Sequence, residues 1–152
     1  MKRLVLSAAI AIAATFTVAT AYAGIGDEET AFISAYKTAF AAKDANGLQA
    51  LLNTDGADPM ALQFYGQMMT AEMADGTLTS IELQDLTADD VTQATTPQDG
   101  PNGKFKLAPK PYKKLVLKID SKSANGTSSS TSTVFVADVG GKVIICTPAP
   151  AK

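Results

Sequence analysis

The chain has 152 residues, with 13 lysines and arginines against 15 acidic residues and a formal net charge of −2. It contains no histidine, which excludes Ser-His-Asp and Cys-His hydrolysis and histidine metal sites. The single cysteine, Cys146, excludes an internal disulfide and a thiolate zinc cluster within one chain. No glycine-rich phosphate loop is present either. The composition therefore predicts neither a cofactor nor a metal.

The first 23 residues have the pattern of a cleaved signal peptide. Lys2 and Arg3 precede an apolar run that ends near Ala19, and Ala21 and Ala23 are small residues placed as at a cleavage site. A membrane anchor is the alternative, but a spanning helix needs about 20 apolar residues and this run is shorter. We expect cleavage after Ala23, export to the periplasm or the medium, and no stable membrane anchor afterwards.

Residues 24–147 are predicted to form a single domain, followed by a flexible tail at 148–152 that is rich in proline and alanine. Nearly all acids of this domain precede residue 100 and nearly all lysines follow it. A basic half can bind nucleic acid, but these lysines are spread along strands and loops and the acidic half can compensate them. We therefore expect no nucleic-acid partner.

The N-terminal half of the domain is predicted to contain three helices. An apolar stripe with helical spacing marks the first: Phe32, Ala35, Tyr36, Ala39 and Phe40. Asp44 can cap a short second helix. Asp58 as N-cap and Pro59 as first helical residue begin a third, which ends near Gly76.

The C-terminal half is predicted to be an antiparallel meander. Four segments alternate as strands do: 79–86, 113–120, 131–138 and 142–147. Residues 88–111 hold several prolines and glycines, which predicts a long irregular loop with at most one short strand at 104–107. Within it, Asp89-Asp90 is interpreted as a solvated turn. Helices followed by a meander indicate an α+β fold, in which N-terminal helices pack on a curved antiparallel sheet.

The pattern Phe32-x-x-Ala-Tyr-x-x-Ala-Phe, followed by Lys43-Asp44-x-x-Gly-Leu-x-x-Leu-Leu, resembles the nuclear-transport-factor-like, cystatin-like superfamily. The resemblance implies a bent sheet wrapped around a long helix to form a cone with a pocket. That superfamily holds enzymes as well as binding modules, so the fold alone does not select a function.

Two-residue hairpin loops at 125–126 and 140–141 would fix the pairing of the three main strands. The expected pairs are Leu117–Val134, Leu115–Val136 and Val136–Ile145. Both faces of such a sheet are apolar, although helices can cover only one. The second face, which holds Val116 and Phe135, is therefore predicted to be covered by a second copy in a homodimer or by the segment 88–111. Cys146 lies in an apolar run and is predicted to be buried and slow to react.

Three functions remain open. We expect a non-enzymatic module that binds an apolar small molecule or a protein partner. One alternative is a cofactor-free pocket enzyme in which Tyr36, Tyr65, Asp85 and Asp138 supply acid-base chemistry, although tyrosines at helical spacing favour a core role. The other is a structural subunit of an envelope assembly. The residues expected to line a pocket or an interface are Tyr36, Tyr65, Met68, Met69, Val116, Phe135 and Ile144.

Overall fold

The computed structural model describes residues 25–100, 103–123 and 126–151. The predicted leader at 1–23 lies outside these residues. No helix in the described part of the chain is long and apolar enough to cross a membrane.

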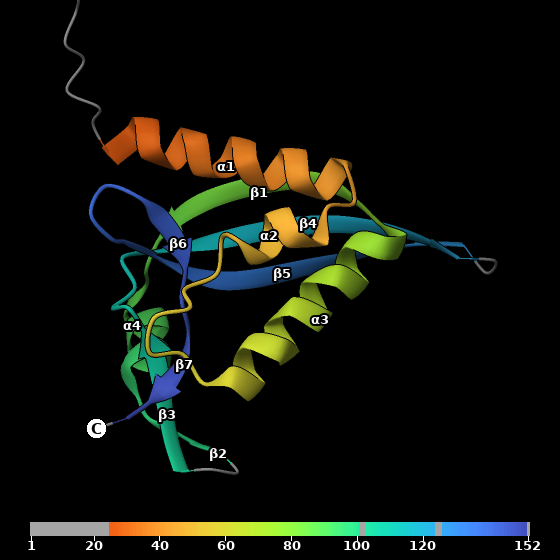
Figure 1. Cartoon of the computed structure of the whole chain (residues 1–152). Helices are drawn as coiled ribbons and strands as arrows, with labels where there is room; N and C mark the ends of the chain where they lie inside the picture. The colour runs from red at the N-terminus through yellow and green to blue at the C-terminus, as the bar shows by residue number, and fades with distance from the viewer. Residues whose placement is uncertain (1–24, 101–102, 124–125, 152) are drawn as a thin grey trace, which may run out of the picture.

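The three predicted helices are confirmed. They are α1 (Ile25–Ala41), α2 (Ala45–Gln49) and α3 (Pro59–Asp75) (Figure 1). The Asp44 side chain accepts a hydrogen bond from the Gly47 amide at the start of α2. The Asp58 side chain accepts two, from the first amides of α3, which satisfies donors that a helix leaves unpaired at its N-terminus.

Seven strands in the described part of the chain form two antiparallel sheets. The larger sheet has the order β1-β4-β5-β6 and the smaller one the order β2-β3-β7. The strands of the larger sheet are β1 (Gly76–Asp85), β4 (Lys113–Ser123), β5 (Gly126–Asp138) and β6 (Val143–Ile145). Those of the smaller sheet are β2 (Gln98–Gly100), β3 (Gly103–Ala108) and β7 (Thr147–Pro150).

The hydrophobic core lies between the N-terminal helices and one face of the larger sheet (Figure 1). Tyr36 and Phe40 of α1 stack at 6.3 Å between ring centroids, and they share the core with Leu115, Leu117 and Ile145, all almost fully buried. Each large side chain buried here contributes about 1.5–3 kcal/mol of hydrophobic stabilisation. The α+β fold, with N-terminal helices on an antiparallel sheet, is thereby confirmed.

The predicted strand pairing is correct for one hairpin and wrong for the other. Val136 pairs with Ile145 as expected. Leu115, however, pairs with Val134 instead of Val136, because Ser123 pairs with Gly126 and places the loop one residue earlier than predicted. This changes the register by two residues. Since side chains alternate with a period of two, each keeps its predicted face of the sheet.

The prediction of a long irregular loop at 88–111 is wrong except for its short strand at 104–107, which is confirmed as β3. The segment also contains α4 (Ala88–Thr95) and β2. Thr87 and Asp90 form a capping box at the start of α4, so Asp90 is part of a helix rather than a solvated turn. The Lys114 ammonium lies 2.7 Å from the Asp90 carboxylate. Hydrogen bonds from Lys114 and Thr87 lower the pKa of Asp90 to about 2.

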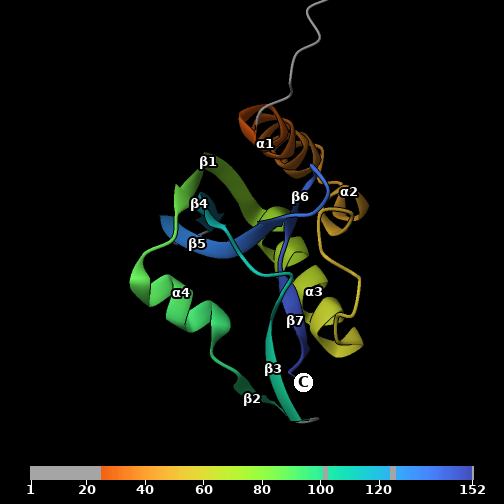
Figure 2. The ribbon, with the colours of Figure 1, turned by 90° about the vertical axis from the view of Figure 1, so that its left-hand side faces the viewer.

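Lys114 shares its sheet face with Val116 and Phe135, so α4 is anchored at the second face of the larger sheet (Figure 2). This is the face for which a second cover was predicted, and the segment 88–111 supplies part of it. Val116 and Phe135 remain half-buried.

The prediction of a flexible tail at 148–152 is wrong for residues 148–150, which belong to a strand. Residues Thr147–Pro150 form β7, which pairs with β3 through Leu107–Pro148 and Phe105–Pro150. The two prolines fit because β7 is an edge strand and the proline nitrogens face away from β3. On that outer side the Pro148 carbonyl accepts a hydrogen bond from the Asp58 amide at 3.0 Å. The tail therefore joins the smaller sheet to the start of α3.

The predicted burial of Cys146 is confirmed, because only 1 % of this residue is exposed. Burial raises the pKa of the Cys146 thiol to about 12, so the reactive thiolate is scarce near neutral pH. We expect a disulfide reagent at pH 8 to label the native protein at least about 100-fold more slowly than the urea-unfolded protein. Equal labelling rates, or a disulfide-linked dimer on a non-reducing gel, would contradict a buried thiol.

Candidate ligand-binding pocket

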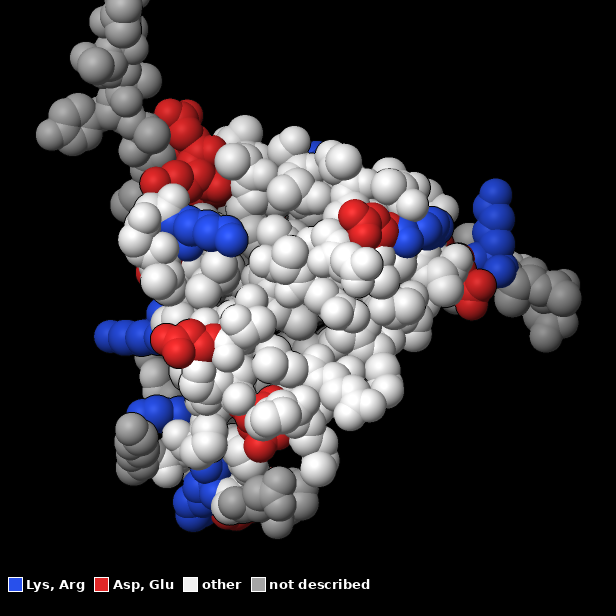
Figure 3. All heavy atoms as spheres, in the orientation of Figure 1, with Lys and Arg blue, Asp and Glu red and all other residues white. Residues whose placement is uncertain are grey.

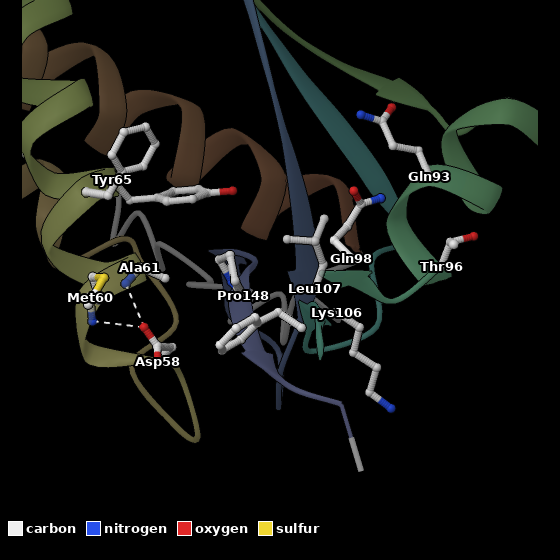
Figure 4. A pocket seen from close by; sticks show the side chains of 12 residues that line it. Asp58, Met60, Ala61, Tyr65, Gln93, Thr96, Gln98, Lys106, Leu107 and Pro148 are labelled. Carbon is white, nitrogen blue, oxygen red and sulfur yellow. Dashed lines mark hydrogen bonds between the residues drawn. The ribbon is translucent and has the colours of Figure 1, made fainter. Parts of the chain in front are cut away.

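A pocket of about 420 Å³ opens between α3 and α4 and is also lined by the strands β3 and β7 (Figure 4). Its volume lies within the roughly 300–1,000 Å³ typical of small-molecule sites. Nearly all of its lining surface is apolar. The pocket is built by the two segments that the sequence analysis took for an irregular loop and a flexible tail, together with the first turns of α3.

The first two turns of α3 form an apolar wall. Met60 and Phe64 lie four residues apart and therefore on one helix face, and Ala61 and Tyr65 complete the wall. Met60 is 58 % exposed and Phe64 is 62 % exposed. Large apolar side chains that stay this exposed along the wall of a hollow mark a binding surface more often than a random surface position.

Strands β3 and β7 form the floor of the pocket. Leu107 and Pro148 are directly paired across the two strands and both line the pocket. Phe105 lies two residues earlier on the same face of β3. Its ring sits against Gly100 of β2, where an added Cβ would come within 2.5 Å of the ring. A glycine at this position therefore leaves room for the ring.

The side of the pocket opposite α3 is formed by residues of polar types. It consists of Gln93 and Thr96 of α4 and Gln98 of β2, with Lys106 of β3 nearby (Figure 4). The Thr96 hydroxyl donates to the Thr92 carbonyl. The side-chain amides of Gln93 and Gln98 have no hydrogen-bond partner in the described part of the chain. Because nearly all of the lining surface is apolar, these polar residues contribute mainly the hydrocarbon parts of their side chains to the pocket.

Asn53 connects the two sheets behind the pocket. Its amide and carbonyl are bonded to the Ile145 carbonyl and the Thr147 hydroxyl, at the junction of β6 and β7. Its side chain donates to the carbonyls of Asp55 and Ala108, the latter at the end of β3. Because Asn53 is buried, these bonds are shielded from competing water. They hold the floor of the pocket in place relative to the helices.

The side chains of Asp58 and Tyr65 are the pocket groups to consider for proton transfer. The Asp58 carboxylate is engaged by the α3 amides. Burial, with a smaller effect of Cys146, raises the pKa of the Tyr65 phenol above its ordinary value, which further disfavours the phenolate. Neither group is therefore set up as a general base.

The seven residues predicted to line a pocket or an interface do not converge on one site. Tyr65 lines the pocket. Tyr36 and Met69 are buried in the core, and Met68 is half-buried on α3. Val116, Phe135 and Ile144 are half-buried on the second face of the larger sheet.

The acids proposed for catalysis lie outside the pocket. Asp85 is the last residue of β1, where it pairs with Lys113. Asp138 ends β5 beside Glu28, and burial together with this acidic neighbour raises the pKa of Glu28. No cluster of three or more metal-binding side chains occurs among the described residues.

Charged side chains on the face shown in Figure 3 lie mostly around its edge, and the area over α2 and α3 is nearly uncharged for the residues that are described.

No protein-family model and no curated protein matches the chain. Among solved structures, the chain is similar to the helical cell shape determining protein Pgp2 from Campylobacter jejuni, with 12 % sequence identity and a TM-score of 0.42. The match covers 78 % of this chain and 38 % of that one. At this level the similarity defines neither a shared family nor a shared activity.

Proposed function

We propose that this protein is an exported, non-enzymatic module that binds an apolar small molecule in the pocket between α3 and α4. The observation that carries the proposal is a hollow of about 420 Å³ with an almost wholly apolar lining. The exposed side chains of Met60 and Phe64 support it, because a ligand that contacted them would remove apolar surface from water. Export rests on the signal-peptide pattern of residues 1–23.

The alternatives predicted from the sequence receive less support. An acid-base enzyme needs an available ionisable group in its pocket, whereas Asp58 caps a helix and burial disfavours the phenolate of Tyr65. The homodimer through the second sheet face stays a prediction. It rests on the half-buried Val116 and Phe135, beside which α4 is already anchored. Membership of the nuclear-transport-factor-like superfamily likewise stays a prediction.

The proposal is tested with the neutral fluorophore N-phenyl-1-naphthylamine, whose emission rises in apolar surroundings. We expect saturable binding to the wild-type protein and about tenfold weaker binding to Phe64→Gln, since losing a buried aromatic contact costs about 1.5 kcal/mol. Val139→Gln is the matched control. Val139 is 47 % exposed at the end of the larger sheet and does not line the pocket.

Unchanged affinity in Phe64→Gln, or an equal loss in both variants, would show that the fluorophore binds elsewhere. Absence of saturable binding to the wild-type protein would refute the proposed function.

A further inference from the structure

Three aromatic side chains line the pocket, and they come from two of its sides. Phe64 and Tyr65 belong to the α3 wall, whereas Phe105 belongs to the floor. The rings of Phe64 and Tyr65 meet edge to face, with centroids 6.4 Å apart and an interplanar angle of 71°. Figure 4 shows the Tyr65 side chain extending from α3 toward the strands of the floor. A ligand in the pocket therefore meets aromatic rings on both its wall and its floor.

The Phe105 ring is held in place and has no aromatic neighbour. It makes no ring contact with another aromatic side chain in the described part of the chain. One edge of the ring lies against Gly100, where an added Cβ would come within 2.5 Å and 2.6 Å of two ring carbons. This contact limits the motion of the half-buried ring. Stacking a ligand on it therefore costs little side-chain entropy.

The charged side chains at the pocket are not placed to hold an ionised ligand. Lys106 alternates with Phe105 and Leu107 along β3, so its ammonium is carried away from the hollow (Figure 4). The Asp58 carboxylate is engaged by the α3 amides. An ionised ligand would lose its hydration without gaining a counter-charge. The volume of about 420 Å³ lies near the lower end of the range for small-molecule sites, which favours a compact ligand.

We propose that the ligand is an uncharged, planar fused-ring aromatic compound of the size of naphthalene or anthracene, bound between the Phe105 ring and the Phe64–Tyr65 pair. This inference rests on the proposed function of the pocket and adds the chemical class of the ligand. Aromatic rings that pack edge to face or offset on one another gain affinity beyond the area they bury. The Met60 thioether beside Phe64 adds a favourable sulfur–aromatic contact. A saturated ligand of the same skeleton gains neither.

The test compares compounds that share one carbon skeleton: 2-naphthol, its saturated analogue decahydro-2-naphthol, and the anion 2-naphthoate. Each displaces N-phenyl-1-naphthylamine from the wild-type protein, from Phe105→Leu and from Phe135→Leu at neutral pH. Competition gives the dissociation constant of each compound, corrected for the affinity of the same variant for the fluorophore. Phe135→Leu is the matched control, since Phe135 is also a half-buried phenylalanine of a strand but does not line the pocket.

We expect the wild-type protein to bind 2-naphthol about two- to tenfold more tightly than decahydro-2-naphthol, the effect of an aromatic contact. Phe105→Leu keeps an apolar side chain and should remove most of this preference by weakening 2-naphthol alone. Phe135→Leu should leave both affinities unchanged. The anion 2-naphthoate should bind the wild-type protein about tenfold more weakly than 2-naphthol, because it finds no counter-charge.

Equal or tighter binding of decahydro-2-naphthol to the wild-type protein would overturn the aromatic class while leaving the apolar pocket intact, and this comparison needs no variant to fold. Equal losses of 2-naphthol affinity in Phe105→Leu and Phe135→Leu would also overturn it. Binding of 2-naphthoate as tight as that of 2-naphthol would overturn the absence of charge. If the fluorophore itself does not bind, both the inference and the proposed function fail.

Discussion

Gly76→Ala is expected to lower the free energy of unfolding by about 2–3 kcal/mol, as overpacking at a closed site does. Gly76 joins α3 to β1, and a Cβ built there would lie 2.2 Å from the Glu72 carbonyl oxygen and 2.5 Å from Ile119. Its backbone angles, φ −94° and ψ 150°, suit any residue. The expected loss of stability therefore arises from steric overlap of the added methyl group and not from backbone strain.

Gly76→Ala should also disturb the end of α3, because a shift of Gly76 moves a carbonyl that accepts a hydrogen bond from the Lys43 ammonium. The same ammonium donates to the carbonyl of Met73. These two bonds satisfy carbonyls that a helix leaves unpaired at its C-terminus. Urea unfolding followed by circular dichroism measures the loss.

Gly26→Ala is the matched control for Gly76→Ala. Gly26 lies in the first turn of α1, and an added Cβ would meet nothing within 4 Å. We expect this variant to be as stable as the wild type or more stable by up to about 1 kcal/mol, since alanine favours a helix over glycine. A Gly76→Ala protein with wild-type stability would show that α3 and β1 do not meet as described.

Asn53→Ala is expected to cost about 2–3 kcal/mol, because it removes two hydrogen bonds that the side chain of the buried Asn53 donates. In the wild-type protein the side-chain amide of Asn53 donates hydrogen bonds to the carbonyls of Asp55 and Ala108, at 3.0 Å and 3.2 Å. No other side chain in the described part of the chain is bonded to the end of β3 and the α2–α3 connection at once. The variant should therefore also weaken fluorophore binding, since the pocket floor loses its link to the helices.

Thr54→Ala is the control for Asn53→Ala, because Thr54 is exposed next to it. It should change neither stability nor binding. A stable Asn53→Ala protein with normal binding would show that the hydrogen bonds of Asn53 do not position the floor.

The sequence was a good guide to the three N-terminal helices because local signals there agree. Asp44 and Asp58 cap the helices that they were predicted to cap. The hairpin at Gly140-Gly141 was also predicted correctly, since both glycines have positive φ angles and suit a two-residue turn. The β4–β5 pairing was wrong because Asn125-Gly126 looks like a turn, whereas Gly126 belongs to β5.

The failures lie in α4 and β7, where local signals are weak or misleading. Among the eight residues of α4, Val91 is the one apolar residue larger than alanine. Its capping box uses Asp90 where glutamate or glutamine is more usual. β7 contains Pro148 and Pro150, which normally argue against a strand. Only pairing with β3 makes both prolines acceptable, and that pairing joins residues far apart in sequence.

The pocket could not be predicted for the same reason. Phe105 and Leu107 fall within the segment taken for a loop, and Pro148 within the presumed tail. Met60 and Phe64 were visible as apolar residues of a predicted helix, but their exposure depends on where the smaller sheet lies. Tyr65 was predicted because a half-buried tyrosine at helical spacing suits either a core or a pocket.

The central claim, an apolar ligand site between α3 and α4, is tested most directly by two-dimensional ¹⁵N NMR of the protein titrated with N-phenyl-1-naphthylamine. The pocket predicts that saturable shift changes cluster on the first turns of α3, on α4 and on β3, and include Phe64 and Leu107. Shift changes centred instead on Val116 and Phe135 of the second sheet face, or no saturable changes at all, would contradict it.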